Sequence, residues 1–209
     1  MIMEVQYIDY GVGNKKSVIN ALLKLKHEIS LVDNPDLINP KKPIILPGVG
    51  SYLHCKKELE KLGFFKVIKD MLDSKAIEKL IGICVGHQLL FERGYEDGNT
   101  EGFGVFEGEV RSMKELASDK KFEAIVPNIS WCEVKDSDSK NIGKYYFIHS
   151  FANLDSKNQV AYYLWNNFKI TALARIEGVW GTQFHPEKSG EKGLRLFNKM
   201  ITLQSDQIL

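Results

Sequence analysis

The sequence has few cysteines and no long apolar run, and both absences exclude whole classes of protein. Its three cysteines, Cys55, Cys84 and Cys132, are an odd number without the spacing of a zinc site, so a disulfide framework is excluded and a reducing compartment is favoured. The longest apolar stretches are far shorter than the ~20 residues that cross a bilayer, and the first residues lack the basic flank and apolar core of a secretory signal. We therefore expect a cytoplasmic protein with no membrane contact and no metal or cofactor.

An excess of charge of one sign is also missing. Lys and Arg number 28 and Asp and Glu 27, which leaves a formal net charge of +1. Proteins that bind nucleic-acid backbones need a clear excess of basic residues, so nucleic acid is excluded as the main ligand. The 44% hydrophobic and 26% charged residues are typical of a globular protein, and no repeat or Pro-, Gly- or Ser-rich linker divides the chain. We expect residues 1–209 to form one domain.

The spacing of apolar residues predicts an α/β fold. In the first half, short buried strands alternate with helical patterns, which is typical of a parallel sheet with crossover helices. Strands are predicted at residues 5–9, 28–32, 44–46 and 80–83, with helices at 18–25, 51–62 and 64–72. The second half is richer in strand patterns, at residues 105–110, 124–126, 145–151, 160–164, 171–176 and 179–184, and ends in a helix at 190–203. The expected architecture is an open, mostly parallel sheet flanked by helices, with additional antiparallel strands in the C-terminal half.

Cys84 lies in a pattern that predicts a nucleophile. It stands between Gly82 and Gly86, after a buried strand and before a helical segment predicted at residues 88–91, which is the setting of a nucleophile elbow. The glycines remove Cβ atoms that would crowd the turn, and the amide of Val85 faces the negative charge that develops when the sulfur attacks. The alternative is a buried apolar cysteine, which is the commoner role of a cysteine taken alone.

His185 is the best candidate among five histidines for the base that a cysteine nucleophile needs. It follows a predicted strand that ends at Pro186, and Glu187 lies two residues further, so in an extended chain both side chains point to one side. Glu187 can then hold the imidazole in one tautomer and stabilise its charged form. A surface pair at a strand end is the alternative, but Cys84 and His185 both follow strand carboxyl ends, where the sites of open α/β sheets assemble.

A glycine-rich turn, PGVGS at residues 47–51, follows the strand at residues 44–46. Its glycines let the backbone approach a ligand and let a peptide plane turn, which suits an oxyanion contact. Without the other two motifs, an ordinary turn between a strand and a helix is the simpler interpretation.

Together these motifs resemble the class I, triad-type glutamine amidotransferases, in which a cysteine elbow is paired with a C-terminal His-x-Glu. Within that family the chain is similar to the glutaminase subunits of imidazole glycerol phosphate synthase. The resemblance extends over nearly the whole chain, through the segments IDYGVGN, ILPGVGSY, GICVGHQLLF, YFIHSF and GTQFHPEKSG. It implies hydrolysis of glutamine to glutamate and ammonia, with the ammonia passed through a protein channel to a (β/α)₈-barrel cyclase or synthase subunit in a heterodimer.

The resemblance also implies roles for single residues. Cys84 would attack the glutamine amide to form a γ-glutamyl thioester, His185 would protonate the leaving ammonia and then activate water, and Glu187 would orient His185. The oxyanion would be held by Val49, Gly50 and Val85, and glutamine by Gln88, Glu96, Ser150 and Phe151.

Departures from the family pattern leave the identity of the partner open. His87 stands where the synthase subunit usually has methionine, and Asn128 and Ser130 replace the His and Gly of a His-Met-Gly-Trp segment that lines the partner interface. The main prediction is a partner that makes imidazole glycerol phosphate in histidine biosynthesis. The alternative is the same glutaminase chemistry feeding a related barrel enzyme that amidates a sugar in surface-polysaccharide biosynthesis. By the same resemblance, Trp131 and Tyr10 are interface candidates, and the alternative for both is a place in the core, which is the commoner role of buried aromatic residues.

Two other classes of function are weaker alternatives. Gly11 and Gly13 after the first strand, with Asp33 after the second, suggest a nucleotide-binding module, but Lys16 occupies the place of the third glycine of that pattern. A non-catalytic partner subunit is the other alternative, and the presence of every triad candidate argues against it.

Overall fold

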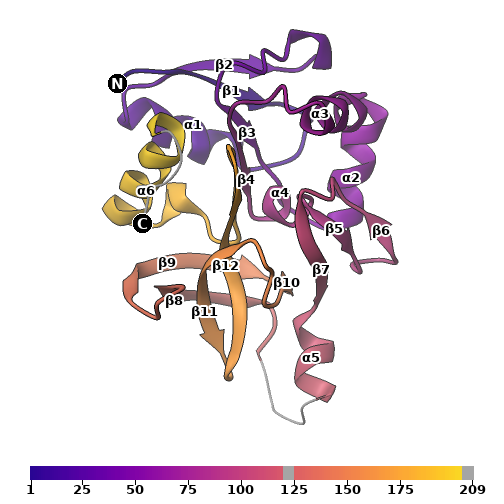
Figure 1. Cartoon of the computed structure of the whole chain (residues 1–209), viewed down its shortest axis with the longest axis vertical. Coiled ribbons are helices and arrows are strands. Elements are labelled where there is room, and N and C mark those ends of the chain that lie inside the picture. The colour runs from indigo at the N-terminus through magenta and orange to yellow at the C-terminus, as the bar shows by residue number, and fades with distance from the viewer. Residues whose placement is uncertain (120–124, 204–209) are drawn as a thin grey trace.

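The computed structural model describes residues 1–119 and 125–203, which form a nine-stranded sheet, a four-stranded sheet and the helices packed on them (Figure 1). One half of the large sheet is parallel, in the order β2 (Glu28–Val32), β1 (Glu4–Ile8), β3 (Ile44–Leu46), β4 (Leu80–Ile83) and β13 (Val179–Thr182). The other half is antiparallel and continues through β12 (Phe168–Ile176), β11 (Gln159–Trp165), β8 (Asn128–Asp136) and β9 (Asn141–His149). The predicted α/β architecture, with antiparallel strands added from the C-terminal half, is confirmed.

Helices cover both faces of the parallel half. Figure 1 shows α1 (Lys15–Lys24) and α6 (Gly190–Thr202) on one side of these strands, and α2 (Tyr52–Lys61) and α3 (Phe64–Asp73) on the other. Strands covered on both faces carry continuous apolar runs, and every residue of β3 and β4 is buried. Within residues 1–119 and 125–203, no helix combines the length and apolar character that crossing a membrane requires.

The smaller sheet has the strand order β10 (Phe151–Asn153), β7 (Phe106–Ser112), β5 (Phe91–Gly94) and β6 (Thr100–Glu101). The one-turn helix α4 (Val85–Gln88) connects β4 of the large sheet to β5, and α5 (Met113–Asp119) follows β7. Short 3-10 helices lie at Pro35–Leu37 and Pro186–Lys188. Only Ser150 separates β9 from β10, so the chain passes between the two sheets at this residue.

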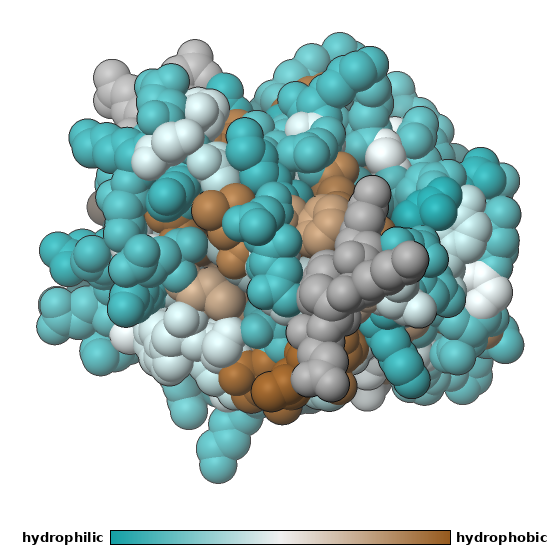
Figure 2. Space-filling view, turned by 90° about the horizontal axis from the view of Figure 1, so that it is seen from below, coloured by the Kyte–Doolittle hydropathy of each residue, from teal (hydrophilic) through white to brown (hydrophobic). Residues whose placement is uncertain are grey.

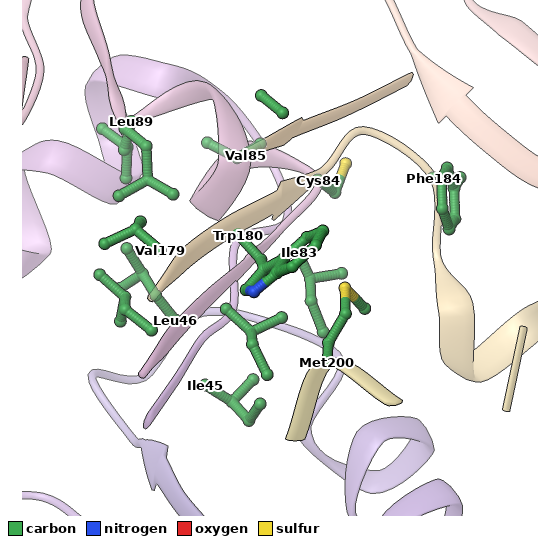
Figure 3. Close-up of a cluster of buried hydrophobic side chains, with 14 of the residues drawn as sticks. Ile45, Leu46, Ile83, Cys84, Val85, Leu89, Val179, Trp180, Phe184 and Met200 are labelled. Atoms are coloured by element: carbon green, nitrogen blue, oxygen red, sulfur yellow. The ribbon is translucent and has the colours of Figure 1, made fainter. Parts of the chain in front are cut away.

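A cluster of apolar side chains lies beneath the carboxyl end of β4 (Figure 3). It includes Ile45 of β3, Ile83 of β4, Trp180 of β13 and Met200 of α6, all at most 2% exposed. Burial of side chains of this size contributes about 1.5–3 kcal/mol each. The strand ends that carry the candidate site are therefore anchored in the core, and Figure 3 shows Cys84 at the edge of this cluster.

Three sequence predictions differ from the structure. The helical segment at residues 88–91 is wrong, because α4 ends at Gln88 and Phe91 pairs with Phe106 of β7 as the first residue of β5. The strand predicted at 145–151 divides at Ser150 between β9 and β10. Of the strand predicted at 124–126, Ala124 lies outside the described residues, and residues 125–126 are not in a strand. The sequence patterns miss the long strand β8, which begins at residue 128.

Candidate active site

Cys84 follows β4 in a backbone conformation that residues other than glycine rarely adopt. Its φ is 56° and its ψ is −110°, and α4 begins at the next residue, Val85. Such a conformation costs of order 1–3 kcal/mol and persists only where the surrounding structure imposes it. It is the strained turn that the elbow pattern predicts, and it brings the sulfur to the carboxyl edge of the sheet.

Glycines allow the backbone of the elbow to contact the backbone of the turn after β3. A Cβ atom added to Gly86 would lie 2.1 Å from the carbonyl oxygen of Leu46, and one added to Gly48 would lie 2.5 Å from the amide nitrogen of Gly86. Neither position can accept a side chain without a shift of the backbone. The glycines predicted to relieve crowding therefore also join the two turns.

His185 reaches the same edge from the neighbouring strand, because β13 pairs in parallel with β4. The backbone N–H of His185 donates to the carbonyl oxygen of Tyr146 on β9 at 3.0 Å. Ser189 Oγ, at the start of α6, donates to the His185 carbonyl oxygen at 2.6 Å. Two elements from different parts of the chain thus hold the backbone of this histidine.

Glu187 is buried beside the His185 ring. Its Oε1 lies 2.8 Å from His185 Nδ1, and the side chains of Glu187 and His185 are 1% and 4% exposed. Burial by itself lowers the pKa of His185, but hydrogen bonding to Cys84 and Glu187, together with the charges of both groups, raises it to about 10. The structure therefore brings Cys84, His185 and Glu187 together at this edge of the sheet.

The turn after β3 is held by hydrogen bonds to three successive carbonyl oxygens. Tyr10 Oη donates to Pro47 at 2.6 Å, the amide of Val85 donates to Gly48 at 3.3 Å, and Cys55 Sγ donates to Val49 at 3.7 Å. The Val85 amide, predicted as an oxyanion donor, is therefore engaged by the protein itself in this conformation. Tyr10 is only 1% exposed, so of the two roles left open by the sequence it has the core position and not the surface one.

A cavity of about 280 Å³ opens at this edge of the sheets. Cys84 and His185 line it, and Glu187 lies behind His185. The wall also contains every residue predicted to hold the oxyanion or glutamine, namely Val49, Gly50, Val85, Gln88, Glu96, Ser150 and Phe151.

Glu96 is fixed at the cavity wall by the main chain of α2. Its Oε2 accepts a hydrogen bond from the Tyr52 amide at 2.7 Å. Burial raises the pKa of Glu96, and the hydrogen bond from Tyr52 opposes that rise. A carboxylate with one oxygen already bonded keeps capacity to accept a further donor from a ligand.

Several residues of the site are missed by the sequence patterns. His149 and Lys188 also line the cavity, and Gln183 Nε2 lies 3.9 Å from Cys84 Sγ. Gln88 Nε2 donates to Gln183 Oε1 at 3.0 Å, which links the two glutamines behind the sulfur. The available signal for Gln183 was its place two residues before His185 in the predicted strand, since such residues share a side.

Comparison of the whole chain with known families decides its assignment. The sequence model described as "Glutamine amidotransferase class-I" matches residues 6–203. The chain belongs to the class-I glutamine amidotransferase family. As an amidotransferase of this family it is a glutaminase-type enzyme subunit, which confirms the resemblance predicted from the motifs.

Curated relatives cover this amidotransferase almost from end to end. The imidazole glycerol phosphate synthase subunit HisH of Prochlorococcus marinus subsp. pastoris is 33% identical over 207 residues, which are 95% of this chain and 97% of the relative. Subunit HisH 1 of the same synthase from Legionella pneumophila is 34% identical over 213 residues, 95% of this chain and 99% of the relative.

Solved structures share the fold of this amidotransferase at low sequence identity. A crystal structure of a glutamine amidotransferase has a TM-score of 0.70 at 18% identity, and covers 95% of this chain and 99% of its own. The structure of PurLQS from Thermotoga maritima also has a TM-score of 0.70, at 20% identity, and covers 96% of this chain and 98% of its own. These likenesses support the fold.

Proposed function

We propose that this amidotransferase hydrolyses L-glutamine to L-glutamate and ammonia with Cys84, His185 and Glu187, and that it passes the ammonia to a barrel-type synthase partner that makes imidazole glycerol phosphate. The observation that carries the proposal is the single cavity in which Cys84 and His185 meet the residues expected to hold glutamine. The names of the relatives, which are subunits of imidazole glycerol phosphate synthase, support the choice of acceptor.

In the proposed reaction, Cys84 Sγ attacks the side-chain amide carbon of glutamine. The proton of the thiol passes to His185 and then to the leaving nitrogen, so that ammonia departs and a γ-glutamyl thioester remains on the sulfur. Water then attacks the thioester, His185 takes its proton, and glutamate and the free thiol are released. The thioester divides one difficult amide hydrolysis into two easier steps. The raised pKa of His185 supports its role as the proton donor at neutral pH.

Glutamine would be oriented by polar groups on the wall of the cavity. Glu96 offers a carboxylate for the α-amino group, and the main chain of Ser150 and Phe151 offers polar groups close to the sulfur. Gln88, which is 2% exposed and bonded to the Phe151 carbonyl at 2.8 Å, would hold this wall in place.

The oxyanion would be stabilised only after the turn at residues 47–50 changes its hydrogen bonds. The Val85 amide donates to Gly48, so it becomes available for a substrate oxygen once that bond is broken. Loss of one oxyanion donor typically lowers turnover by about 10²- to 10³-fold. We therefore propose that the isolated chain hydrolyses glutamine slowly and that the partner raises the rate.

The proposed docking surface for the partner lies on β8. Ile129 and Trp131 are 56% and 53% exposed, and the surface seen from below has apolar patches among hydrophilic residues (Figure 2). Asn128 and Ser130, where the chain departs from the family pattern, are half-buried and hydrogen-bonded to each other. Their side chains therefore leave the outward residues of β8 in place for contact with a partner.

The experiment is glutamine hydrolysis by the purified chain, with and without the barrel synthase encoded beside it, together with Cys84→Ala. We expect partner-stimulated release of glutamate that the variant loses by more than about 10³-fold. A chloroketone analogue of glutamine should alkylate Cys84 and leave Cys55 and Cys132 unmodified, as read by peptide mass spectrometry. Full activity of Cys84→Ala would contradict the proposed chemistry. Stimulation only by a sugar-modifying partner would contradict the acceptor.

A further inference from the structure

A chain of hydrogen bonds runs from β8 to the wall of the cavity. Asn128 Nδ2 lies 3.2 Å from Tyr163 Oη, and Tyr163 Oη lies 3.0 Å from His149 Nε2. His149 Nδ1 lies 2.9 Å from the carbonyl oxygen of Phe151. The same carbonyl oxygen accepts a hydrogen bond from Gln88 Nε2 at 2.8 Å. This series of hydrogen bonds thus ends at Phe151 and Gln88, which both line the cavity.

The Phe151 carbonyl, at the end of the series, fixes the direction of every hydrogen bond in it. A carbonyl oxygen only accepts, so His149 Nδ1 must carry the proton that it donates to Phe151. In a neutral ring Nε2 then has a lone pair and accepts from the Tyr163 hydroxyl, which leaves the Tyr163 oxygen to accept from the Asn128 amide. Ser130 Oγ, at 2.7 Å, donates to Asn128 Oδ1 and so orients that amide.

The neutral state that this direction requires is favoured at His149. Burial lowers its pKa to about 4, the bond to the Phe151 carbonyl opposes that fall, and the charge of His185 adds to it. Tyr163 is 1% exposed and His149 is 6% exposed, so water has little access to compete for these bonds.

Side chains alternate between the two faces of β8, so Asn128, where the series of hydrogen bonds starts, lies behind the proposed docking surface. Ile129 and Trp131 point outward, whereas Asn128 and Ser130 are turned inward on the opposite side of the strand. A change in the position of β8 is therefore transmitted to Asn128 directly, one residue away from exposed Ile129.

We infer that Asn128, Tyr163 and His149 are positioning residues that fix the Phe151 carbonyl, and through it Gln88, for the binding of glutamine. None of the three is assigned a catalytic step. The inference rests on the proposed function, because it presumes that the cavity binds glutamine. Its physical content is that a series of hydrogen bonds with one direction, from Asn128 to the Phe151 carbonyl, decides where Phe151 and Gln88 stand in the cavity wall.

The test uses the full chain with Cys84→Ala, so that bound L-glutamine is not consumed. Tyr163→Phe keeps the ring and removes the hydroxyl that donates to His149. We expect the Kd for L-glutamine, measured by calorimetry, to rise about five- to tenfold, the usual effect of one lost buried hydrogen bond. The matched control is Tyr162→Phe, whose hydroxyl pairs with Ser139 Oγ at 2.9 Å on the neighbouring position of β11. We expect its Kd to be unchanged.

A spectroscopic signature separates positioning from a purely structural role. In ¹⁵N spectra of the histidine rings, His149 should show a protonated Nδ1 and a hydrogen-bonded, unprotonated Nε2. In Tyr163→Phe the Nε2 signal should move to that of a ring nitrogen without a donor. Asn128→Asp should do the same with no loss of volume, because a carboxylate accepts from Tyr163 and withdraws its hydroxyl from His149.

The outcomes are distinguishable. If Cys84→Ala does not bind L-glutamine at all, the proposed function is overturned and this inference falls with it. If Cys84→Ala binds L-glutamine and Tyr163→Phe leaves the Kd unchanged, only the positioning role is overturned. A wild-type His149 that carries its proton on Nε2 also overturns it. If Tyr163→Phe does not fold, the same two readings are taken on Asn128→Asp.

Discussion

The amide nitrogen of Val85 donates to the carbonyl oxygen of Gly48 at 3.3 Å, directly beside the cavity. The bond joins the elbow after β4 to the turn after β3, which also pack so closely that both contacts require glycine. In this state the turn occupies a donor that the proposed reaction needs. The proposed mechanism therefore predicts that the rate of the isolated protein depends on the stability of this short turn.

Tyr10→Phe should loosen this loop. The Tyr10 hydroxyl donates to Pro47, the residue before Gly48, at 2.6 Å. Its removal should lower the free energy of unfolding by about 1 kcal/mol and raise partner-free glutamine hydrolysis by about fivefold, because the Val85 amide is released more often. Chemical denaturation and a glutamate assay measure the two effects. A loss of stability with no change in rate would show that the bond only supports the fold.

Glu187→Gln should change the pH dependence of stability. The pKa of His185 is raised to about 10 in the folded protein, against about 6.5 when unfolded, so its protonation stabilises the fold fully below pH 6.5. That contribution is lost as the pH rises through about 10. Without the Glu187 charge the pKa of His185 falls, so the variant should have a lower Tm than the wild type near pH 6.5, and the difference should shrink towards pH 10.

The control for this experiment is Glu191→Gln. Glu191 is exposed at the start of α6, where it lies 3.8 Å from Arg195 and takes no part in the buried pair. Its Tm should follow that of the wild type across the same pH range. A Glu187→Gln difference that stays constant with pH would mean that this carboxylate does not stabilise the protonated form of His185.

Gly86→Ala should destabilise the protein and displace the elbow that carries Cys84. The added methyl group would lie 2.1 Å from the Leu46 carbonyl oxygen, so the elbow and the turn must move apart. We expect the free energy of unfolding in urea to fall by about 1–3 kcal/mol.

Gly104→Ala is the control, because Gly104 has a φ of 66° and no atom within 4 Å of the added group. It should cost only the backbone strain of about 1–2 kcal/mol and leave the site intact. Equal active-site occupancy by the chloroketone in both variants would argue that the close contact does not shape the elbow.

Trp131→Ala should weaken the complex with the partner and leave the isolated chain stable. Trp131 is 53% exposed and packs edge-on against Tyr146, whose carbonyl holds His185. Truncation of an exposed aromatic anchor typically costs about 2 kcal/mol of binding, which is roughly a thirtyfold rise in Kd. Leu23→Ala, 58% exposed on α1, is the matched control and should bind normally. Titration of the barrel synthase by light scattering or calorimetry measures both.

The parallel half of the fold could be predicted from the sequence because its signals are local. β2, β3 and β4 have the predicted bounds. β3 and β4 are buried throughout, as their apolar sequences predict, and β3 is followed directly by Pro47. Cys84 could be found because it stands directly after β4, and His185 because it follows the strand predicted at residues 179–184.

The antiparallel half is harder to predict from the sequence, because in strand β8 the usual pattern of outward polar and inward apolar residues is inverted. In β8 the apolar Ile129 and Trp131 face outward, and the polar Asn128 and Ser130 face inward, where they take part in hydrogen bonds. No local rule distinguishes such a strand from a loop. The break at Ser150 depends on pairing with two different sheets, which is decided by residues distant in the sequence.

β13 lies between β4 and β12 in the middle of the large sheet, although it is synthesised near the end of the chain. A chain that is still being translated can build β1 to β4 but must leave β4 as an open edge, of the kind that invites pairing with other polypeptides. Closing that edge needs contacts between residues about 100 positions apart, such as Ile83 with Thr182, and pairing over such separations is slow. The growing chain therefore contains Cys84 about 100 residues before His185 is added, and its edge at β4 stays open until the last strand is inserted.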